Sequence, residues 1–121
     1  MYLIDSVILI DHFNGIDKAS RFLSQHQKEI SISAITRAEV LTGFDAEDLP
    51  AAKQLLDYLP NIPIDKAEAD LAAELRRQYR WKLPDALQAA VAINYGVTLV
   101  TRNTKDFALD RHHFVLLPYQ L

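Results

Sequence analysis

The chain has no cysteine among its 121 residues, and this absence removes two classes of structure at once. Disulfide bonds are impossible, and so are metal sites built on thiolates. The lack of cysteine fits the reducing cytoplasm, which is the location we expect. Only 3 glycines and 5 prolines are present, and they do not gather into a linker that would divide the chain. We therefore expect a single domain over residues 1–121.

Long apolar runs are also missing. No stretch approaches the roughly 18 consecutive apolar residues that a membrane-spanning helix needs, so we expect no membrane association. The apolar start of the chain lacks a basic region and is interrupted by Asp5, which disfavours a secretory signal. Positive charge is scarce as well, because 13 basic residues face 16 acidic ones and leave a net charge of −3. Binding to nucleic acid must therefore depend on a local basic patch or a bound metal.

The spacing of hydrophobic residues, which make up 50% of the chain, predicts short strands that alternate with helices. The predicted strands cover residues 2–4, 30–33, 61–64, 97–101 and 114–117. Helical periodicity and end signals predict helices at 6–13, 17–27, 34–44, 51–59, around 71–79 and at 84–95. This alternation predicts an α/β fold with a parallel sheet covered on both faces. Ligands of such folds bind beyond the carboxyl ends of the strands.

Acidic and amide side chains follow several of these strands. Asp5 comes directly after the first strand, and Glu39 lies in the second turn of the helix after the second strand. Asp85 opens the alanine-rich helix that leads to the fourth strand, and two further polar residues follow that strand. Five side chains from remote segments are thus expected to converge at one edge of the sheet: Asp5, Glu39, Asp85, Asn103 and Asp106.

Carboxylates that converge in this way repel one another. Two unit charges about 5 Å apart cost roughly 3 kcal/mol at an effective dielectric constant of about 20. A hard divalent cation removes this cost, because Mg²⁺ and Mn²⁺ prefer oxygen ligands. Such a cation orients a phosphate, lowers the pKa of a bound water and neutralises the leaving oxygen. The acidic set therefore predicts metal-assisted cleavage of a phosphodiester.

Each acid taken alone also has a simpler interpretation. A carboxylate in the first turn of a helix interacts favourably with the helix dipole, which would account for Asp85. Glu39 is compatible with a solvated helix position, and Asp106 with a cap on the turn that follows it. Asp11 lies farther along the first predicted helix, where we expect a capping or surface role. The metal hypothesis thus depends on the whole set rather than on any one member.

Three blocks of the sequence resemble the PIN-domain family. The opening MYLIDSVILID is similar to its first motif, in which a hydrophobic strand ends in Asp followed by a small hydroxyl residue. The block SAITRAEVLTG resembles the second motif, and WKLPDALQAAVAINYGVTLVTRNTKDF resembles the third and fourth. The blocks occur in the family's order and span most of the chain. Together with the short length, they resemble the VapC toxins of VapBC toxin–antitoxin pairs.

This resemblance implies a PIN-like three-layer α/β/α sandwich around a parallel sheet. It implies an endoribonuclease that acts on RNA such as tRNA or rRNA. It further implies that Asp5, Glu39 and Asp85 form the acidic core around Mg²⁺ or Mn²⁺. A homodimer and inhibition by a VapB-type antitoxin are implied as well, and we expect an antitoxin segment to place a basic side chain, an arginine by preference, in the acidic pocket.

The chain departs from the family pattern at two places. Many relatives carry an amide residue two positions after the first Asp, where this chain has Val7, although Ser6 keeps the hydroxyl. The family's fourth acid can fall at the position of Asn103, which is neutral here. Asp106, three residues later, is the alternative for that role, and Thr101 can support the same loop.

Basic residues surround the third and fourth motifs. We expect Arg102 at the edge of the pocket, where it would hold RNA phosphates. Tyr79 and Trp81 would add stacking on unpaired bases, although Tyr79 also fits a buried helix stripe. A solvated helix face is the more common explanation for charges of this kind. The remaining candidates are Arg37, Arg76, Arg77, Arg80, Lys82 and Lys105.

Two other functions stay open from the sequence alone. A degenerate PIN module would bind RNA or a protein partner without cleavage, and the neutral Asn103 keeps this alternative alive. A small phosphatase or receiver-like domain would use Asp5 as a phosphoacceptor, but no acidic pair or lysine motif accompanies that residue. Metal-dependent RNA cleavage separates the first alternative from a nuclease, and covalent labelling of Asp5 would indicate the second.

Overall fold

The computed structural model describes residues 1–121 as five strands and six helices. The strands are β1 (Tyr2–Ile4), β2 (Ile30–Ser33), β3 (Asn61–Ile62), β4 (Thr98–Val100) and β5 (Val115–Leu116). The helices are α1 (Ser6–Phe13), α2 (Asp17–Gln25), α3 (Ala34–Thr42), α4 (Leu49–Asp57), α5 (Lys66–Tyr79) and α6 (Leu83–Tyr95). Every predicted element is present in the predicted order. Helices α2 and α3 each end two residues earlier than expected, α4 begins and ends two residues earlier, and the last three strands are shorter.

The strands form one parallel sheet in the order β3-β2-β1-β4-β5. The predicted α/β architecture with a parallel sheet is therefore confirmed. Because β1 has β2 on one side and β4 on the other, the strand order reverses between β1 and β4. Ile4 pairs with Val100 at the last register position of these two strands. Asp5 and Thr101 follow directly, so both lie where ligands bind in open parallel sheets.

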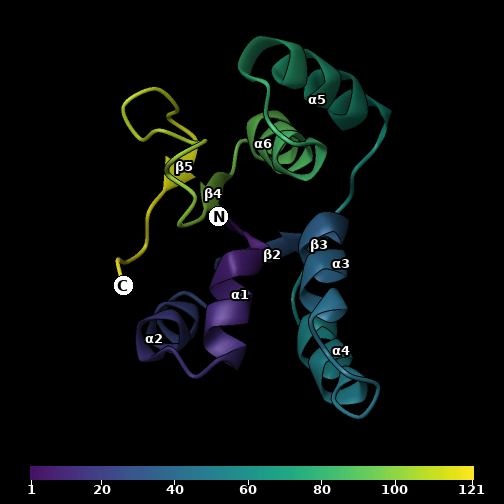
Figure 1. Cartoon of the computed structure of the whole chain (residues 1–121), viewed down its shortest axis with the longest axis vertical. Coiled ribbons are helices and arrows are strands. Elements are labelled where there is room, and N and C mark those ends of the chain that lie inside the picture. Colours follow the sequence, from purple (N-terminus) through teal and green to yellow (C-terminus); the bar gives the residue numbers. More distant parts are fainter.

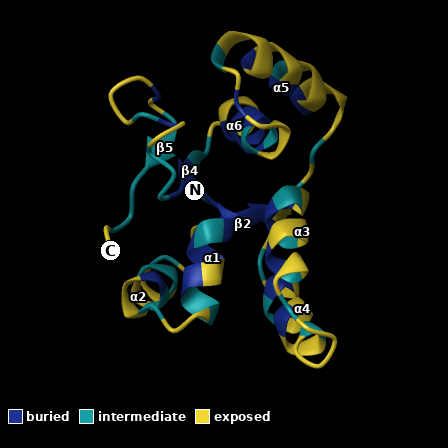
Figure 2. Cartoon of the chain, viewed as in Figure 1, coloured by how far each residue is buried: buried dark blue, intermediate teal, exposed yellow.

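Helices cover both faces of the sheet and give three layers (Figure 1). Because successive strand residues point to opposite faces, the sheet contributes to two separate cores. Leu3 and Leu99 pack with α5 and α6, whereas Ile4 and Val100 pack with α1, α3 and α4. The central strands are buried, and the exposed residues lie on the outer sides of the helices (Figure 2). None of the six helices is long and apolar enough to cross a membrane.

Helix α6 is the central helix, as its composition predicts. Pro84 stands in its first turn, where proline is well tolerated. Gly96 ends the helix with φ 65° and ψ 34°, a left-handed conformation that glycine adopts without steric cost. The alanines between these ends are buried, and their small side chains let α5 and the sheet approach closely. This packing fixes the position of Asp85 in the first turn of α6.

Candidate active site

Asp5 lies at the point where β1 ends and α1 begins. It is the N-cap of α1, and its Oδ1 accepts a hydrogen bond of 2.9 Å from the backbone N–H of Ser6. Thr101 Oγ1 donates to Asp5 Oδ2 over 2.6 Å, and Gln88 Nε2 donates to Oδ1 over 3.4 Å. Only 7% of Asp5 is exposed. The carboxylate is thus held by donors from three separate segments of the chain.

Glu39 reaches the same place from α3. The hydroxyl of Ser6 donates to Glu39 Oε1 over 3.0 Å, so the first and second motifs are in direct contact. Loss of hydration at the carboxyl raises the pKa of Glu39, and the charge of Asp5 adds to this increase, while the hydrogen bond from Ser6 opposes it. Glu39 is therefore linked to Asp5 through Ser6 and lies within reach of its charge.

Asp85 is the most perturbed carboxyl of the group. Burial, followed by the charges of Asp5, Asp106 and Glu39, raises the pKa of Asp85 from 3.8 to about 6, and Lys82 opposes the shift. The four carboxyls that the sequence singled out therefore form one electrostatic cluster, with Asp85 at its centre. The charges of these residues thus act on Asp85, although no three of them lie close enough together to hold one metal ion directly.

Asn103 and Asp106, the two candidates for the fourth position, are hydrogen-bonded to each other in the loop after β4. Asn103 Nδ2 donates to Asp106 Oδ2 over 3.1 Å, and the backbone N–H of Asp106 donates to Asn103 Oδ1 over 3.4 Å. The backbone N–H of Asn103 in turn donates to Thr101 Oγ1 over 3.1 Å. Asp106 is exposed and contributes to the raised pKa of Asp85. The negative charge at this corner of the pocket comes from Asp106, which Asn103 orients.

The cluster fits a divalent cation that retains part of its hydration shell. None of the ion pairs in the structure involves Asp5, Glu39, Asp85 or Asp106. The cluster therefore carries negative charge without a paired basic side chain, and this repulsion adds to the effect of burial in raising the pKa of Asp85. No three acidic or histidine side chains lie close enough together to hold one ion directly. Contacts through water suit Mg²⁺, which keeps several waters in protein sites.

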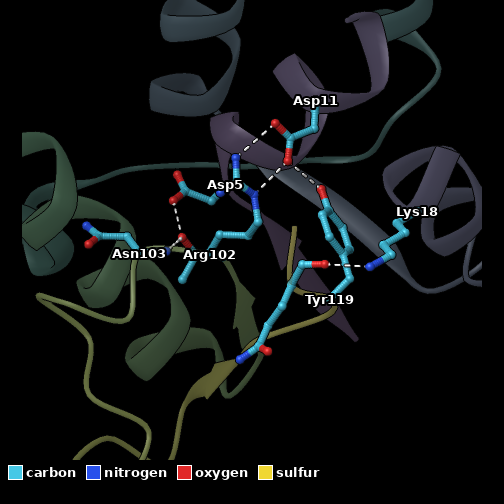
Figure 3. Close-up of polar contacts among 8 residues, drawn as sticks. Asp5, Asp11, Lys18, Arg102, Asn103 and Tyr119 are labelled. Carbon is cyan, nitrogen blue, oxygen red and sulfur yellow. Dashed lines mark hydrogen bonds and ion pairs between the residues drawn. The ribbon is translucent and has the colours of Figure 1, made fainter. Parts of the chain in front are cut away.

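The guanidinium of Arg102, which we expected at the edge of the pocket, is bound to a carboxylate of α1. It forms a bidentate ion pair with Asp11, with distances of 2.7 Å from Nε to Oδ2 and 2.9 Å from Nη2 to Oδ1 (Figure 3). Tyr119 donates its hydroxyl proton to Asp11 Oδ2 over 2.7 Å, and Lys18 Nζ donates to the backbone carbonyl of Gln120 over 2.7 Å. The C-terminal tail is thereby tied to α1 and α2.

This arrangement corrects the predicted capping or surface role of Asp11, which is only 6% exposed. Burial acts to raise the pKa of Asp11, but the hydrogen bonds from Arg102 and Tyr119 and the charge of Arg102 outweigh burial and lower it. Burial and then the hydrogen bond to Asp11 raise the pKa of Tyr119. Arg102 therefore neutralises Asp11 and leaves the charge of the acidic cluster uncompensated.

The predicted stacking of Trp81 on RNA bases is wrong. Trp81 is 4% exposed and belongs to the core on the α5–α6 side of the sheet. Its ring stacks on Tyr79 at 4.5 Å between centroids, and its Nε1 donates to the backbone carbonyl of Asp106 over 3.1 Å. The left-handed conformation of Arg80, with φ 61°, turns the chain after α5 so that Trp81 enters the core. Trp81 supports the loop that carries Asp106.

An apolar cleft lies away from the acidic cluster. It has a volume of about 560 Å³ and is lined mainly by apolar side chains of α1, α2 and α4 and by their flanking residues. Leu9, Leu23 and Leu55 form part of its wall, and Tyr58 at its rim is 79% exposed. His12 is half-buried here, and its Nδ1 is hydrogen-bonded to Ser20 Oγ over 2.7 Å. The cleft offers an apolar surface rather than catalytic chemistry.

Three polar residues behind Asp5 were not singled out from the sequence. Ser33, Thr36 and Gln88 are each at most 1% exposed and are hydrogen-bonded to one another. Their separations along the chain reach 55 residues, so no local pattern indicates the contacts. One signal was available, because Gln88 is the only strongly polar residue between Asp85 and Ile93 in an otherwise apolar helix.

Comparison with known proteins agrees with this geometry. Residues 2–111 match the profile of the PIN domain. "Ribonuclease VapC19" of Mycobacterium tuberculosis is 29% identical over 117 residues, which cover 90% of this chain and 94% of the relative. "Ribonuclease VapC10" of the same organism is 29% identical over 116 residues, covering 90% of this chain and 87% of the relative.

Solved structures give the same result. One chain of a toxin–antitoxin complex from Klebsiella pneumoniae superposes with a TM-score of 0.90 at 35% identity, and the match covers 100% of both chains. A chain of VapBC2 from Rickettsia felis, solved bound to a DNA fragment from its promoter, superposes with a TM-score of 0.75 at 27% identity. That match covers 88% of this chain and 90% of the other.

Proposed function

Because this chain belongs to the PIN-domain family, we propose that it is a metal-dependent endoribonuclease and the toxin of a type II toxin–antitoxin system. The observation that carries the proposal is the cluster of Asp5, Glu39, Asp85 and Asp106, which share one electrostatic site without a basic partner. The two curated relatives named above are both called ribonucleases. A structural role alone gives no reason to gather four repelling carboxylates at the end of β1.

Asp5, Glu39 and Asp85 are the residues that would hold Mg²⁺ or Mn²⁺, either directly or through water. When bound there, the cation supplies a Lewis acid for the phosphate oxygens and lowers the pKa of water beside the scissile bond. Asp106 completes the site from the opposite loop, and Asn103 orients it. Ser6 and Thr101 hold Glu39 and Asp5 in place through their hydroxyl groups.

One carboxylate of the cluster accepts the proton of the attacking water. A general base is most effective when its pKa lies near the working pH. Burial and the neighbouring charges raise the pKa of Asp85 to about 6, so Asp85 would act as the base from a position linked to the ion through water, while Asp5 and Glu39 hold the ion. Asp5, in contrast, accepts three hydrogen bonds and is nearly buried, which suits a ligand held in a fixed orientation.

RNA would approach across the end of α5 and the turn into α6. Arg76, Arg77, Arg80 and Lys82 are exposed in this segment, and none of them forms an ion pair within the chain. Lys82 lies close enough to Asp85 to oppose the increase in its pKa. This segment provides the local positive charge that a chain of net charge −3 needs for phosphate contacts. The substrate class that we expect is tRNA or rRNA.

The partner that we expect is a VapB-type antitoxin. Several of the structural neighbours are toxin–antitoxin complexes. The uncompensated acidic cluster would accept an arginine of the antitoxin, and the apolar cleft between α2 and α4 would accept its apolar side chains. Expression of this chain alone should arrest growth, and co-expression of a small protein encoded next to it should relieve the arrest. Unimpaired growth with the wild type alone would count against a toxin. We also expect a homodimer, which light scattering tests.

The decisive experiment for the activity is RNA cleavage by the purified protein with Mn²⁺. Wild type should cut tRNA or rRNA and lose this activity in EDTA. Asp5→Asn and Asp85→Asn should each abolish cleavage while the protein remains folded. The matched control is Asp70→Asn, which removes an exposed carboxylate from α5 and should leave cleavage unchanged. Full activity of either site variant, or of wild type in EDTA, would overturn the mechanism. RNA binding without any metal-dependent product would indicate a binding module instead.

A further inference from the structure

Gln88 is a buried amide in a place where an alanine-rich helix has no structural need for one. It lies three residues after Asp85 on α6, hence on nearly the same side of the helix, and only 1% of it is exposed. Its neighbours on α6 are mostly alanines and other apolar residues that pack in the core. A buried amide is costly unless its donors and acceptor are satisfied, so the partners of Gln88 reveal what it does.

The orientation of the Gln88 amide is fixed by its neighbours. Ser33 Oγ caps α3 and accepts the backbone N–H groups of Ile35 and Thr36, so its single proton must go to Gln88 Oε1, 2.6 Å away. Thr36 Oγ1 donates its own proton to the carbonyl of Ile4 over 2.9 Å, and it therefore accepts from Gln88 Nε2 over 2.8 Å. The second proton of Nε2 is left for Asp5 Oδ1 at 3.4 Å.

We propose that Gln88 is a positioning residue for the acidic site, a role that rests on the proposed metal-dependent function. Its amide holds Oδ1 of Asp5 while Thr101 holds Oδ2, so the plane of the carboxylate is set by two side chains from different elements. The same amide ties α6, which carries Asp85, to the start of α3, which carries Glu39. Gln88 thus sets the spacing of the three proposed ligands without touching substrate or metal.

A purely structural role would have different consequences. If Gln88 only satisfied buried hydrogen bonds, its replacement would lower stability and leave the affinity for metal unchanged. If it positions Asp5, replacement should weaken metal binding in the folded protein as well. Changes to the outer partners of metal ligands reduce metal affinity by about 10–100-fold, so the two roles are separable.

The chain offers a matched pair of serines for this test. Ser31 and Ser33 both lie on β2, both are 0% exposed, and each donates one hydrogen bond of 2.6–2.7 Å. Ser31 donates to the backbone carbonyl of Tyr2, away from the site, whereas Ser33 fixes the amide of Gln88. Ser31→Ala therefore measures the cost of losing a buried strand hydroxyl, and Ser33→Ala adds the loss of orientation at Gln88.

We would measure Mn²⁺ affinity by calorimetry for the wild type, Gln88→Met, Ser33→Ala and Ser31→Ala. Gln88→Met keeps the length of the side chain and should bind Mn²⁺ about 10–100-fold more weakly than wild type. Ser33→Ala should weaken binding by a smaller factor, and Ser31→Ala should not change it. Thermal unfolding of each variant confirms that it is folded. Equal Mn²⁺ affinity of all four proteins would overturn the positioning role. If the Asp5→Asn variant bound no Mn²⁺ in the same assay, the proposed nuclease site would stand without that role.

A second readout is independent of metal binding. In the metal-free protein, the side-chain amide signals of Gln88 in nitrogen-15 NMR spectra should exchange slowly with solvent. They should shift in Asp5→Asn and Ser33→Ala but not in Ser31→Ala. Two results would overturn the proposal even if the wild type bound no Mn²⁺. One is amide exchange as fast as that of an exposed glutamine, and the other is Gln88 signals that shift in neither Asp5→Asn nor Ser33→Ala. If only the nuclease hypothesis failed, the wild type would bind no Mn²⁺, but the Gln88 amide would still exchange slowly and shift in Asp5→Asn and Ser33→Ala.

Discussion

Replacing Asp85 by asparagine should make the metal-free protein more stable, although Asp85 belongs to the site. Burial and the charges of Asp5, Asp106 and Glu39 raise its pKa from 3.8 to about 6. Between about pH 4 and pH 6 the folded protein therefore binds more protons at Asp85 than the unfolded chain does. The free energy of unfolding falls as the pH rises through this window, and the loss is complete above it.

The size of the effect follows from the shift. Two pKa units correspond to about 3 kcal/mol, an upper value because Asp85 is only half-buried. The carboxylate also interacts favourably with the N-terminus of α6, which is worth up to about 1 kcal/mol and is lost in the variant. Asp85→Asn should thus raise the free energy of unfolding at pH 8 by about 2 kcal/mol. At pH 4 the gain should disappear, because Asp85 is then largely protonated in the wild type.

The assay is urea unfolding of both proteins in EDTA between pH 4 and pH 8. Asp17→Asn is the matched control, because Asp17 also lies in the first turn of a helix but is exposed and paired with Arg21. It should lower stability slightly at pH 8. Addition of Mn²⁺ should stabilise the wild type and not Asp85→Asn, because only a protein that binds the ion gains stability from it. An Asp85→Asn variant that is no more stable than the wild type at pH 8 would refute the electrostatic reasoning.

Arg80→Gly should raise the free energy of unfolding by about 1 kcal/mol, because φ 61° is strained for arginine. The same variant should bind RNA more weakly and with a smaller salt dependence. Unchanged RNA affinity would show that Arg80 is not part of the proposed interface. Tyr119→Phe should cost about 1 kcal/mol in urea unfolding through one lost hydrogen bond. Asp11→Ala should cost more, about 2–3 kcal/mol, because it leaves Arg102 unpaired, and equal costs would contradict the ion pair. Acrylamide should quench the fluorescence of Trp81 only weakly, and added RNA should not change it, since the ring is buried. An RNA-dependent change in this fluorescence would contradict the core position of Trp81.

The fold could be predicted from the sequence because its signals are local. Hydrophobic spacing located every strand and helix, and Gly96 marked the end of α6. The predictions fail where tertiary contacts determine the length of an element or the burial of a side chain. The expected strand 61–64 is reduced to two residues because only Asn61 and Ile62 pair with β2 at the sheet edge. The turn at Arg80 and the burial of Trp81 depend on packing of α5 against the core, which no local pattern encodes.

The candidate site could be predicted in part. Strand order brings the ends of β1 and β4 together, so the positions of Asp5 and Asp106 follow from topology. What could not be predicted is which side chains hold the acids. Arg102 was expected to bind RNA phosphates, but its guanidinium forms a bidentate pair with Asp11, which lies 91 residues away in the sequence. Gln88 likewise bonds to Asp5 across 83 residues, and only the packed structure shows that contact.

A crystal of this protein soaked in Mn²⁺ tests the central claim most directly, because anomalous scattering locates the ion without reference to activity. We predict one strong peak beyond the end of β1, with a carboxylate oxygen of Asp5 or Asp85 about 2.1 Å away and the remaining contacts made through water. The exposed carboxylates of Asp45, Glu47 and Asp48 between α3 and α4 serve as an internal control and should stay empty. A peak only at that loop, or none beside Asp5, would contradict the account.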